Sequence, residues 1–168
     1  MLEPFKVTIR IELRTPGTKS DAGYGSAMAV STLIDTGAIV SVLDERDRWH
    51  KICSETLAEL RYPLLTSEAV VTEVFHLAGD SPYEMKRVWS FLRSGVIKTL
   101  PIDDIEMPHL EALMLRYSDR PMDFADATLV YLAKREEVTT IFTIDHADFE
   151  TYRISGHRRF RIFPKSRP

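Results

Sequence analysis

VSTLIDTGAIVSVL, residues 30–43, begins with a short apolar run, reaches an aspartate and continues into a second apolar segment. The run 30–34 has the length and composition of a buried strand, and it ends at Asp35. A β-branched run at 139–144 ends in the same way at Asp145. Further strands are expected at 64–66, 96–100 and 160–163, and helices at about 47–60, 67–78, 82–95, 104–117 and 123–135. This alternation predicts βαβ units, and therefore an α/β fold with a mostly parallel sheet and helices on both faces.

Length and composition describe an ordinary globular chain. Its 168 residues favour one domain, and 44% apolar with 28% charged residues argues against disorder or a fibre. The single cysteine, Cys53, excludes a disulfide framework and a four-cysteine zinc site, and it fits a reducing compartment. No apolar run approaches the roughly 18 residues that span a bilayer, and the N-terminus lacks the apolar core of a signal peptide. We therefore expect a cytoplasmic protein with no membrane partner.

An N-terminal extension, residues 1–29, precedes this pattern. Apolar and polar side chains alternate over 5–13, which predicts a half-buried strand, and a linker rich in glycine and small residues follows. Because Met28 would itself be a suitable start, the native status of 1–27 is left open. The expected organisation is the extension, one domain over 30–164 and a basic tail over 165–168.

The formal net charge of −3 conceals an uneven distribution along the chain. Residues 31–150 hold 12 basic and 22 acidic residues, for a net charge of −10, whereas residues 151–168 hold six basic residues and no acidic ones. An acidic body with a basic end is unlike a uniformly basic nucleic-acid binder. The acidity reflects either clustered carboxylates or ordinary solvated helix faces.

Five acidic residues occupy positions that could place them in one site. Asp35 and Asp145 directly follow strands, so both would point into the crevice at the carboxyl ends of a parallel sheet, although such aspartates also cap turns. Glu73 lies within an apolar helix stripe formed by residues 70, 74 and 77, and Asp126 extends the stripe of the helix from Asp123. A buried lone carboxylate costs several kcal/mol unless it is paired, protonated or bound to a metal. The first-turn positions of Asp123 and Asp126 also suit the helix dipole, which offers no explanation for Glu73.

Oxygen ligands without histidine or cysteine at ligand spacing select a hard divalent cation, Mg²⁺ or Mn²⁺, rather than zinc. Clustered carboxylates that hold such ions are suited to phosphodiester hydrolysis, because the cation stabilises charge on the reacting phosphate. An acidic pocket repels phosphate unless cations occupy it, so metal dependence is a physical requirement of this interpretation.

Four segments, in order and at matching spacing, resemble the PIN-domain ribonucleases of the VapC toxin type. They are LIDTGAIVSVLDERDRWH (33–50), LTSEAVVTEVFHL (65–77), MDFADATLVYLAKR (122–135) and IFTIDHADFETYR (141–153), with RRFRIFP (158–164) closing the match. The resemblance runs from about residue 31 to residue 164. It departs from the family at the N-terminal extension, since such proteins usually begin just before the first aspartate.

The resemblance implies a three-layer α/β/α sandwich and a Mg²⁺-dependent endoribonuclease, with Mn²⁺ as a substitute, acting as the toxin of a toxin–antitoxin pair. It also implies a homodimer, an RNA substrate and a VapB-type antitoxin that occludes the acidic site. The family's catalytic and metal-binding acids fall on Asp35, Glu73, Asp126 and Asp145, and Asp123 matches an accessory metal ligand. Thr36 and Thr143 match small hydroxyl residues beside the site.

Two other functions are compatible with parts of the sequence. Residues 33–43 also resemble the Asp-Thr-Gly loop of retroviral-type aspartic proteases, but that fold is all-β, whereas residues 47–135 have helical periodicity. A PIN-like module that binds RNA or a protein without cutting is the second alternative. The complete set of acids favours the nuclease, because a pure binder has no need of it.

Basic residues supply the candidates for RNA contact. They are Arg120, shortly before Asp123, and the tail arginines Arg158, Arg159 and Arg161. Arginines that alternate with aromatic residues suit an RNA backbone. The same pattern suits an edge strand whose outer side is blunted by charge, and the two interpretations are compatible.

Overall fold

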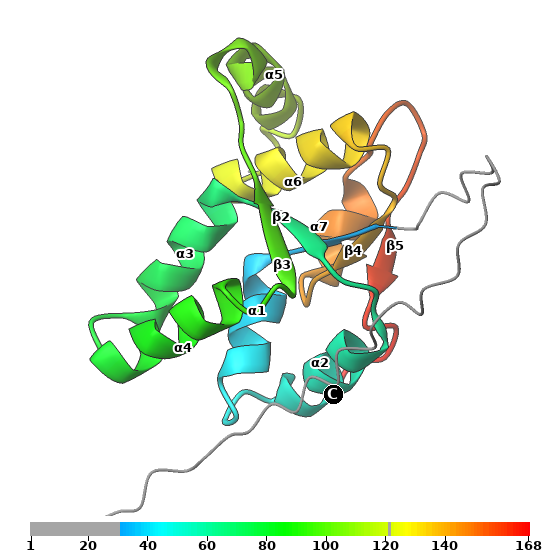
Figure 1. Ribbon diagram of the computed structural model, residues 1–168. Helices are drawn as coiled ribbons and strands as arrows, with labels where there is room; N and C mark the ends of the chain where they lie inside the picture. Colours follow the sequence, from blue (N-terminus) through cyan, green and yellow to red (C-terminus); the bar gives the residue numbers. More distant parts are fainter. Residues whose placement is uncertain (1–30, 121) are drawn as a thin grey trace, which may run out of the picture.

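The computed structural model describes residues 31–120 and 122–168 (Figure 1). In these residues one sheet has the strand order β3-β2-β1-β4-β5, and every neighbouring pair is parallel. The strands are β1 (Thr32–Ile34), β2 (Leu64–Ser67), β3 (Ile97–Leu100), β4 (Thr140–Phe142) and β5 (Arg161–Phe163). Helices flank the sheet, which confirms the α/β sandwich (Figure 1). The N-terminal extension, its expected strand at 5–13 and Val30 lie outside the described residues.

The helices follow the strands in alternation. They are α1 (Thr36–Leu43), α2 (His50–Glu59), α3 (Glu68–Ala78), α4 (Pro82–Leu92), α5 (Met107–Arg116), α6 (Phe124–Arg135) and α7 (His146–Thr151), with a 3₁₀ turn (Asp104–Glu106) before α5. Ser67, Ser81 and Asp123 cap α3, α4 and α6 through their side-chain oxygens, as expected of these residue types. None of the helices in the described ranges is long and apolar enough to cross a bilayer.

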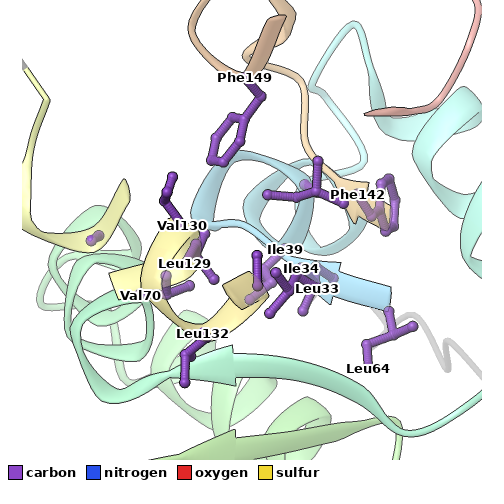
Figure 2. Close-up of a cluster of buried hydrophobic side chains, with 14 of the residues drawn as sticks. Leu33, Ile34, Ile39, Leu64, Val70, Leu129, Val130, Leu132, Phe142 and Phe149 are labelled. Atoms are coloured by element: carbon purple, nitrogen blue, oxygen red, sulfur yellow. The ribbon is translucent and has the colours of Figure 1, made fainter. Parts of the chain in front are cut away.

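The centre of the sheet is its most buried part. All three residues of β1 and of β4 are buried, because both strands are internal and covered on both faces. Figure 2 shows Leu33 and Ile34 of β1 among side chains from the surrounding elements, including Leu129 and Leu132 of α6. The carboxyl ends of β1 and β4 are therefore anchored in the core, and this anchoring fixes the positions of the residues that directly follow the two strands.

Two helices of the structure were not expected from the sequence. The apolar segment after Asp35 is the helix α1, although it is rich in β-branched residues, which disfavour helices. Its N-cap at Asp35 and the burial of Ala38 and Ile39 compensate for the low propensity. The other unexpected helix, α7, has only six residues, too few for a periodicity to be recognised.

The stripe expected on α3 is wrong at its last position. Val70 and Val74 are buried and Glu73 is half-buried, but Leu77 is 61% exposed. The last turns of α3 pack against α4 instead of the sheet, with the rings of Phe75 and Trp89 at 4.9 Å. The stripe therefore applies to the first two turns, and these include Glu73.

Candidate active site

The carboxyl ends of β1 and β4 meet where the strand order reverses. Ile34 pairs with Phe142, so Asp35 and Thr143 are the next residues on adjacent strands. The N–H of Asp35 donates to the carbonyl oxygen of Phe142 at 3.0 Å. Open α/β sheets bind ligands in the crevice at such a reversal, which makes this the candidate site.

Asp35 is buried there, with both side-chain oxygens hydrogen-bonded. Oδ1 accepts from the N–H of Thr36 at 2.6 Å, and Oδ2 accepts from the Thr143 hydroxyl at 2.7 Å. Burial raises the pKa of Asp35 to about 6 against these two hydrogen bonds, and the charges of Asp123 and Asp145 contribute to the rise. The carboxyl group is held in place, yet its ionisation is opposed by its surroundings.

A close approach of the chain explains the glycine in this segment. A Cβ at Gly37 would lie 2.7 Å from Cγ1 of Ile144, the residue between Thr143 and Asp145. A side chain at position 37 would therefore force the side chain of Ile144 to move. Glycine at position 37 therefore leaves the space that the side chain of Ile144 occupies beside the start of α1.

Glu73 reaches the site from α3. Its Oε2 accepts from the hydroxyl of Thr36 at 2.8 Å, and the backbone N–H of Thr36 binds Asp35. One threonine thus connects the carboxylates of two separate elements. Ser67 ties α3 to α6 as well, because its hydroxyl accepts from that of Thr128 at 2.7 Å.

Asp126 and Asp123 belong to the start of α6. Asp123 is exposed, and its Oδ1 accepts from the N–H of Asp126 at 2.8 Å, so it is the N-cap of the helix. Asp126 is half-buried in the first turn. Burial, together with the charges of Asp35, Asp123 and Asp145, raises the pKa of Asp126 to about 8. The four aspartates are therefore close enough to repel one another.

Asp145 follows the short loop after β4 and is exposed. Its N–H donates to the Thr143 hydroxyl at 2.9 Å, so Thr143 contacts both Asp35 and Asp145. One turn into α7, burial and the neighbouring charge of Asp145 raise the pKa of Asp148. Asp148 extends the acidic group, and the sequence analysis missed it because α7 itself was not recognised.

Tyr152 is a second residue that the sequence analysis did not select. It is fully buried at the end of α7, and its hydroxyl donates to Oδ2 of Asp126 at 3.0 Å. Burial and the charge of Asp126 raise the pKa of Tyr152, so the hydroxyl keeps its proton and remains a donor. A buried tyrosine needs a hydrogen-bond partner, but the sequence does not indicate which one.

Comparison with known proteins identifies the family of the chain. Residues 32–154, most of the chain and all five acids among them, match the PIN domain family. The chain belongs to this family. This PIN domain is 28% identical over 137 residues to the ribonuclease VapC26 of Mycobacterium tuberculosis, a match that covers 79% of this chain and 99% of the relative.

Solved structures share the fold of this PIN domain. The toxin VapC20 of Mycobacterium tuberculosis, which cleaves the sarcin–ricin loop, has a TM-score of 0.64 at 17% identity over 69% of this chain and 91% of its own. VapBC2 of Rickettsia felis, bound to promoter DNA, has a TM-score of 0.58 at 13% identity, and the match covers 79% of this chain and 98% of the VapBC2 chain. FitAcB of Neisseria gonorrhoeae has a TM-score of 0.52 at 17% identity, and the match covers 68% of this chain and 87% of FitAcB. The parallel sheet and the helix after Asp35 also exclude the all-β aspartic protease fold.

The donors at the site fit a hard cation. Within 31–120 and 122–168, no three histidine, cysteine, aspartate or glutamate side chains are arranged to enclose a metal ion by themselves. Mg²⁺ has no need of such a cage, because it usually keeps several waters and binds one or two carboxylates. The charges of Asp123 and Asp145 contribute to the raised pKa values of Asp35 and Asp126, and a divalent cation would relieve this repulsion. Oxygen donors, repulsion and incomplete enclosure are all compatible with a hydrated Mg²⁺ or Mn²⁺.

The candidate RNA-contact arginines lie in different places. Arg120 is exposed and donates to the Thr151 hydroxyl of α7 at 2.6 Å. Arg161 begins β5, and Arg158 and Arg159 precede it, so these three lie at the amino ends of the strands. The aspartates lie at the carboxyl ends. Contact of any of the four with RNA stays a prediction.

Proposed function

We propose that this PIN domain is a Mg²⁺-dependent endoribonuclease and the toxin of a toxin–antitoxin pair. The observation that carries the proposal is the gathering of Asp35, Asp123, Asp126 and Asp145 where the strand order reverses, close enough that their charges raise the pKa values of Asp35 and Asp126. The VapC26 and VapC20 relatives are a ribonuclease and an RNA-cleaving toxin, which supports RNA as the substrate.

In this proposal each acid has a defined role. Asp35, Glu73, Asp126 and Asp145 would hold the cation, directly or through its bound waters, and one of these carboxylates would accept the proton of the attacking water; Asp123 would be an accessory ligand. A bound Mg²⁺ or Mn²⁺ supplies Lewis-acid chemistry and neutralises the acidic site, so that a phosphodiester can approach. The Thr36 hydroxyl orients Glu73, and the Thr143 hydroxyl orients Asp35.

Glu73 offers the sharpest test of the site. We expect Glu73→Gln to abolish RNA cleavage and to leave folding intact, because the side chain is half-buried and its contact with Thr36 survives the change. Glu68→Gln is the matched control, since it makes the same change at an exposed position of the same helix. Cleavage is measured by gel analysis of labelled RNA, and folding by circular dichroism and urea unfolding. Full activity of Glu73→Gln would remove Glu73 from the mechanism.

Metal dependence separates the nuclease from the binding module. Structured tRNA, rRNA and mRNA are incubated with the protein and Mg²⁺ or Mn²⁺, with EDTA as the control. The nuclease predicts cleavage that EDTA abolishes. If none of these RNAs is cut under either metal, a PIN-like module that binds RNA or a protein becomes the better explanation.

We also propose a homodimer and a VapB-type antitoxin as partners. The VapBC2 relative is named for such a pair. Two exposed apolar areas suit protein contacts: one on α3 and α4, with Leu77, Tyr83 and Trp89, and one around α5, with Ile105 and Leu115. Sedimentation of the protein alone tests the dimer. Co-expression with a VapB-type protein, such as the product of a short reading frame if one adjoins the gene, tests whether a bound partner suppresses cleavage.

A further inference from the structure

Tyr152 connects the end of α7 to the acidic site. The residue lies six positions beyond His146, the first residue of the helix, and its N–H donates to the carbonyl of Asp148 at 2.9 Å. Its side chain is fully buried, but the hydroxyl ends at Oδ2 of Asp126 at a distance of 3.0 Å. An aromatic residue of the core thus donates a hydrogen bond to a carboxylate of the candidate site.

The ring of Tyr152 has little freedom to move. It packs edge-on against Tyr117 at 5.1 Å and against Phe149 at 5.4 Å, and Phe149 in turn packs against Phe160 at 5.4 Å. Tyr117 is itself fixed to the end of α7, because its hydroxyl accepts from the N–H of Arg153 at 3.0 Å. The Tyr152 hydroxyl is therefore a donor whose place is set by the core rather than by solvent.

Asp126 needs such a donor more than a surface aspartate does. It is half-buried on the first turn of α6 and lies near the charges of Asp35, Asp123 and Asp145. Repulsion from those charges favours any rotation that carries the carboxylate away from the site. A fixed donor on one oxygen opposes that rotation, as a partner in the outer shell of a metal site commonly does.

We propose that Tyr152 is a positioning residue: its hydroxyl holds the Asp126 carboxylate in the orientation in which that side chain binds the divalent cation. The inference rests on the proposed function, because it assigns Asp126 to a cation site. Tyr152 itself contacts neither cation nor RNA. It couples the conformation of Asp126 to the packing of α7.

A matched pair of variants separates positioning from simple stability. Tyr152→Phe removes the hydroxyl that contacts Asp126 and keeps the ring. Tyr117→Phe removes a hydroxyl from the adjacent ring, where it accepts a hydrogen bond from the backbone N–H of Arg153 and, among the described residues, none from the acids. Both changes delete one hydrogen bond beside α7, so both should lower the urea concentration at the midpoint of unfolding by a similar amount.

Mn²⁺ affinity is the readout, measured by titration calorimetry on the folded full-length chain at a temperature below each variant's unfolding transition. We expect Tyr152→Phe to bind Mn²⁺ about 10- to 100-fold more weakly and Tyr117→Phe to bind it as the unmodified protein does. In an Asp126→Asn background, Tyr152→Phe should cause no further loss, because the two residues act through one contact.

The outcomes distinguish the inference from the proposed function. Equal Mn²⁺ affinity of Tyr152→Phe and Tyr117→Phe, or an additive loss in the Asp126→Asn background, would overturn the positioning role while leaving the nuclease intact. Failure of the unmodified protein to bind Mn²⁺ or Mg²⁺ would overturn the proposed function and the inference with it.

Discussion

At the scale of single residues, the site holds two buried or half-buried carboxyl groups, Asp35 and Asp126, whose ionisation is opposed by burial and by neighbouring aspartates. Burial is the largest cause of the raised pKa of Asp126, and three neighbouring aspartates add to it. Hydrogen bonds from Thr36, Thr143 and Tyr152 partly offset the same effect at Asp35 and Asp126. Such a group is unfavourable for stability on its own, and strained electrostatics of this kind are typical of functional sites.

The contribution of Asp35 and Asp126 to the stability of the metal-free protein should therefore fall as the pH rises. Between the unfolded pKa of 3.8 and the folded values of about 6 for Asp35 and about 8 for Asp126, the folded state holds more protons than the unfolded chain. Stability falls with pH wherever the folded state binds more protons, so the loss accumulates from about pH 4 to pH 8.

Asp126→Asn tests this pH dependence. In EDTA we expect the variant to be more stable than the unmodified protein at pH 8 by about 1–3 kcal/mol, because asparagine carries no charge for burial and the neighbouring aspartates to oppose. The gain is smaller than the full pKa shift of Asp126 would give, because coupled acids share that shift. Near pH 4 the two proteins should be equally stable. Urea unfolding at both pH values measures the difference. A variant that is less stable at pH 8 would show that the four aspartates do not repel one another as described.

At the scale of elements, the helix that carries Asp126 is anchored at its other end. Glu106 precedes α5, and its carboxylate accepts from both Tyr131 and Arg135 of α6, at 2.9 Å and 3.0 Å. Glu106 also accepts from the N–H of Asp103 at 2.8 Å, and this hydrogen bond is the main cause of its lowered pKa. The contacts hold the last turns of α6 against the segment after β3.

We expect Glu106→Gln to lower stability by about 1–3 kcal/mol at pH 7, because Arg135 loses a largely buried partner. Glu136→Gln removes the other carboxylate on Arg135, which is more exposed, and should cost less than about 1 kcal/mol. Since the folded pKa of Glu106 is depressed, its contribution is present above the unfolded value of 4.5 and is lost as pH falls through the folded value. Urea unfolding at pH 7 and pH 3 checks both points, and equal effects of the two variants would contradict the anchor.

At the scale of the whole molecule, the parallel sheet separates two groups of basic residues. The N–H of Thr143 donates to the carbonyl of Phe163 at 2.9 Å, so the chain after β5 runs beside the loop that leads to Asp145. Lys165 and Arg167 follow on this side, where the charge of Arg167 lowers the pKa of His146, the neighbour of Asp145, after the larger effect of burial. The end of the chain lies beside α2 in the view of Figure 1. Arg158 and Arg159 precede β5 and therefore lie at the amino ends of the strands, opposite the carboxyl ends that carry the aspartates.

If the tail guides RNA, the pair at the carboxyl edge should matter more. We expect a Lys165→Ala, Arg167→Ala double variant to weaken RNA binding several-fold. The slope of the logarithm of the RNA-binding constant against the logarithm of salt concentration should fall by an amount equivalent to about one phosphate contact or more. An Arg158→Ala, Arg159→Ala double variant removes the same charge at the amino ends of the strands and should weaken RNA binding less. Binding of labelled single-stranded RNA is measured with Mg²⁺ in a Glu73→Gln background. A larger loss from the second pair would contradict this arrangement.

The sequence alone determined the fold class and selected five candidate acids. Apolar runs that end at Asp35 and Asp145, with helical periods between them, were enough for a parallel α/β sheet, since these signals are local. Asp123, Asp126 and Glu73 were recognisable because a charge stands in or beside an apolar stripe. Thr36 and Thr143 came only from the family resemblance, and their contacts with Glu73 and Asp35 are visible in the structure.

Tertiary structure decided what depends on distance between elements. Tyr152 donates to Asp126, 26 positions earlier, Gly37 must leave room for Ile144, and Leu77 is exposed because the end of α3 packs on α4. No local pattern encodes these contacts, because each depends on how two elements pack. The same holds for charge: the sequence shows an acidic body and a basic end, but only the strand order separates Arg158 and Arg159 from the aspartates and brings Arg167 near His146.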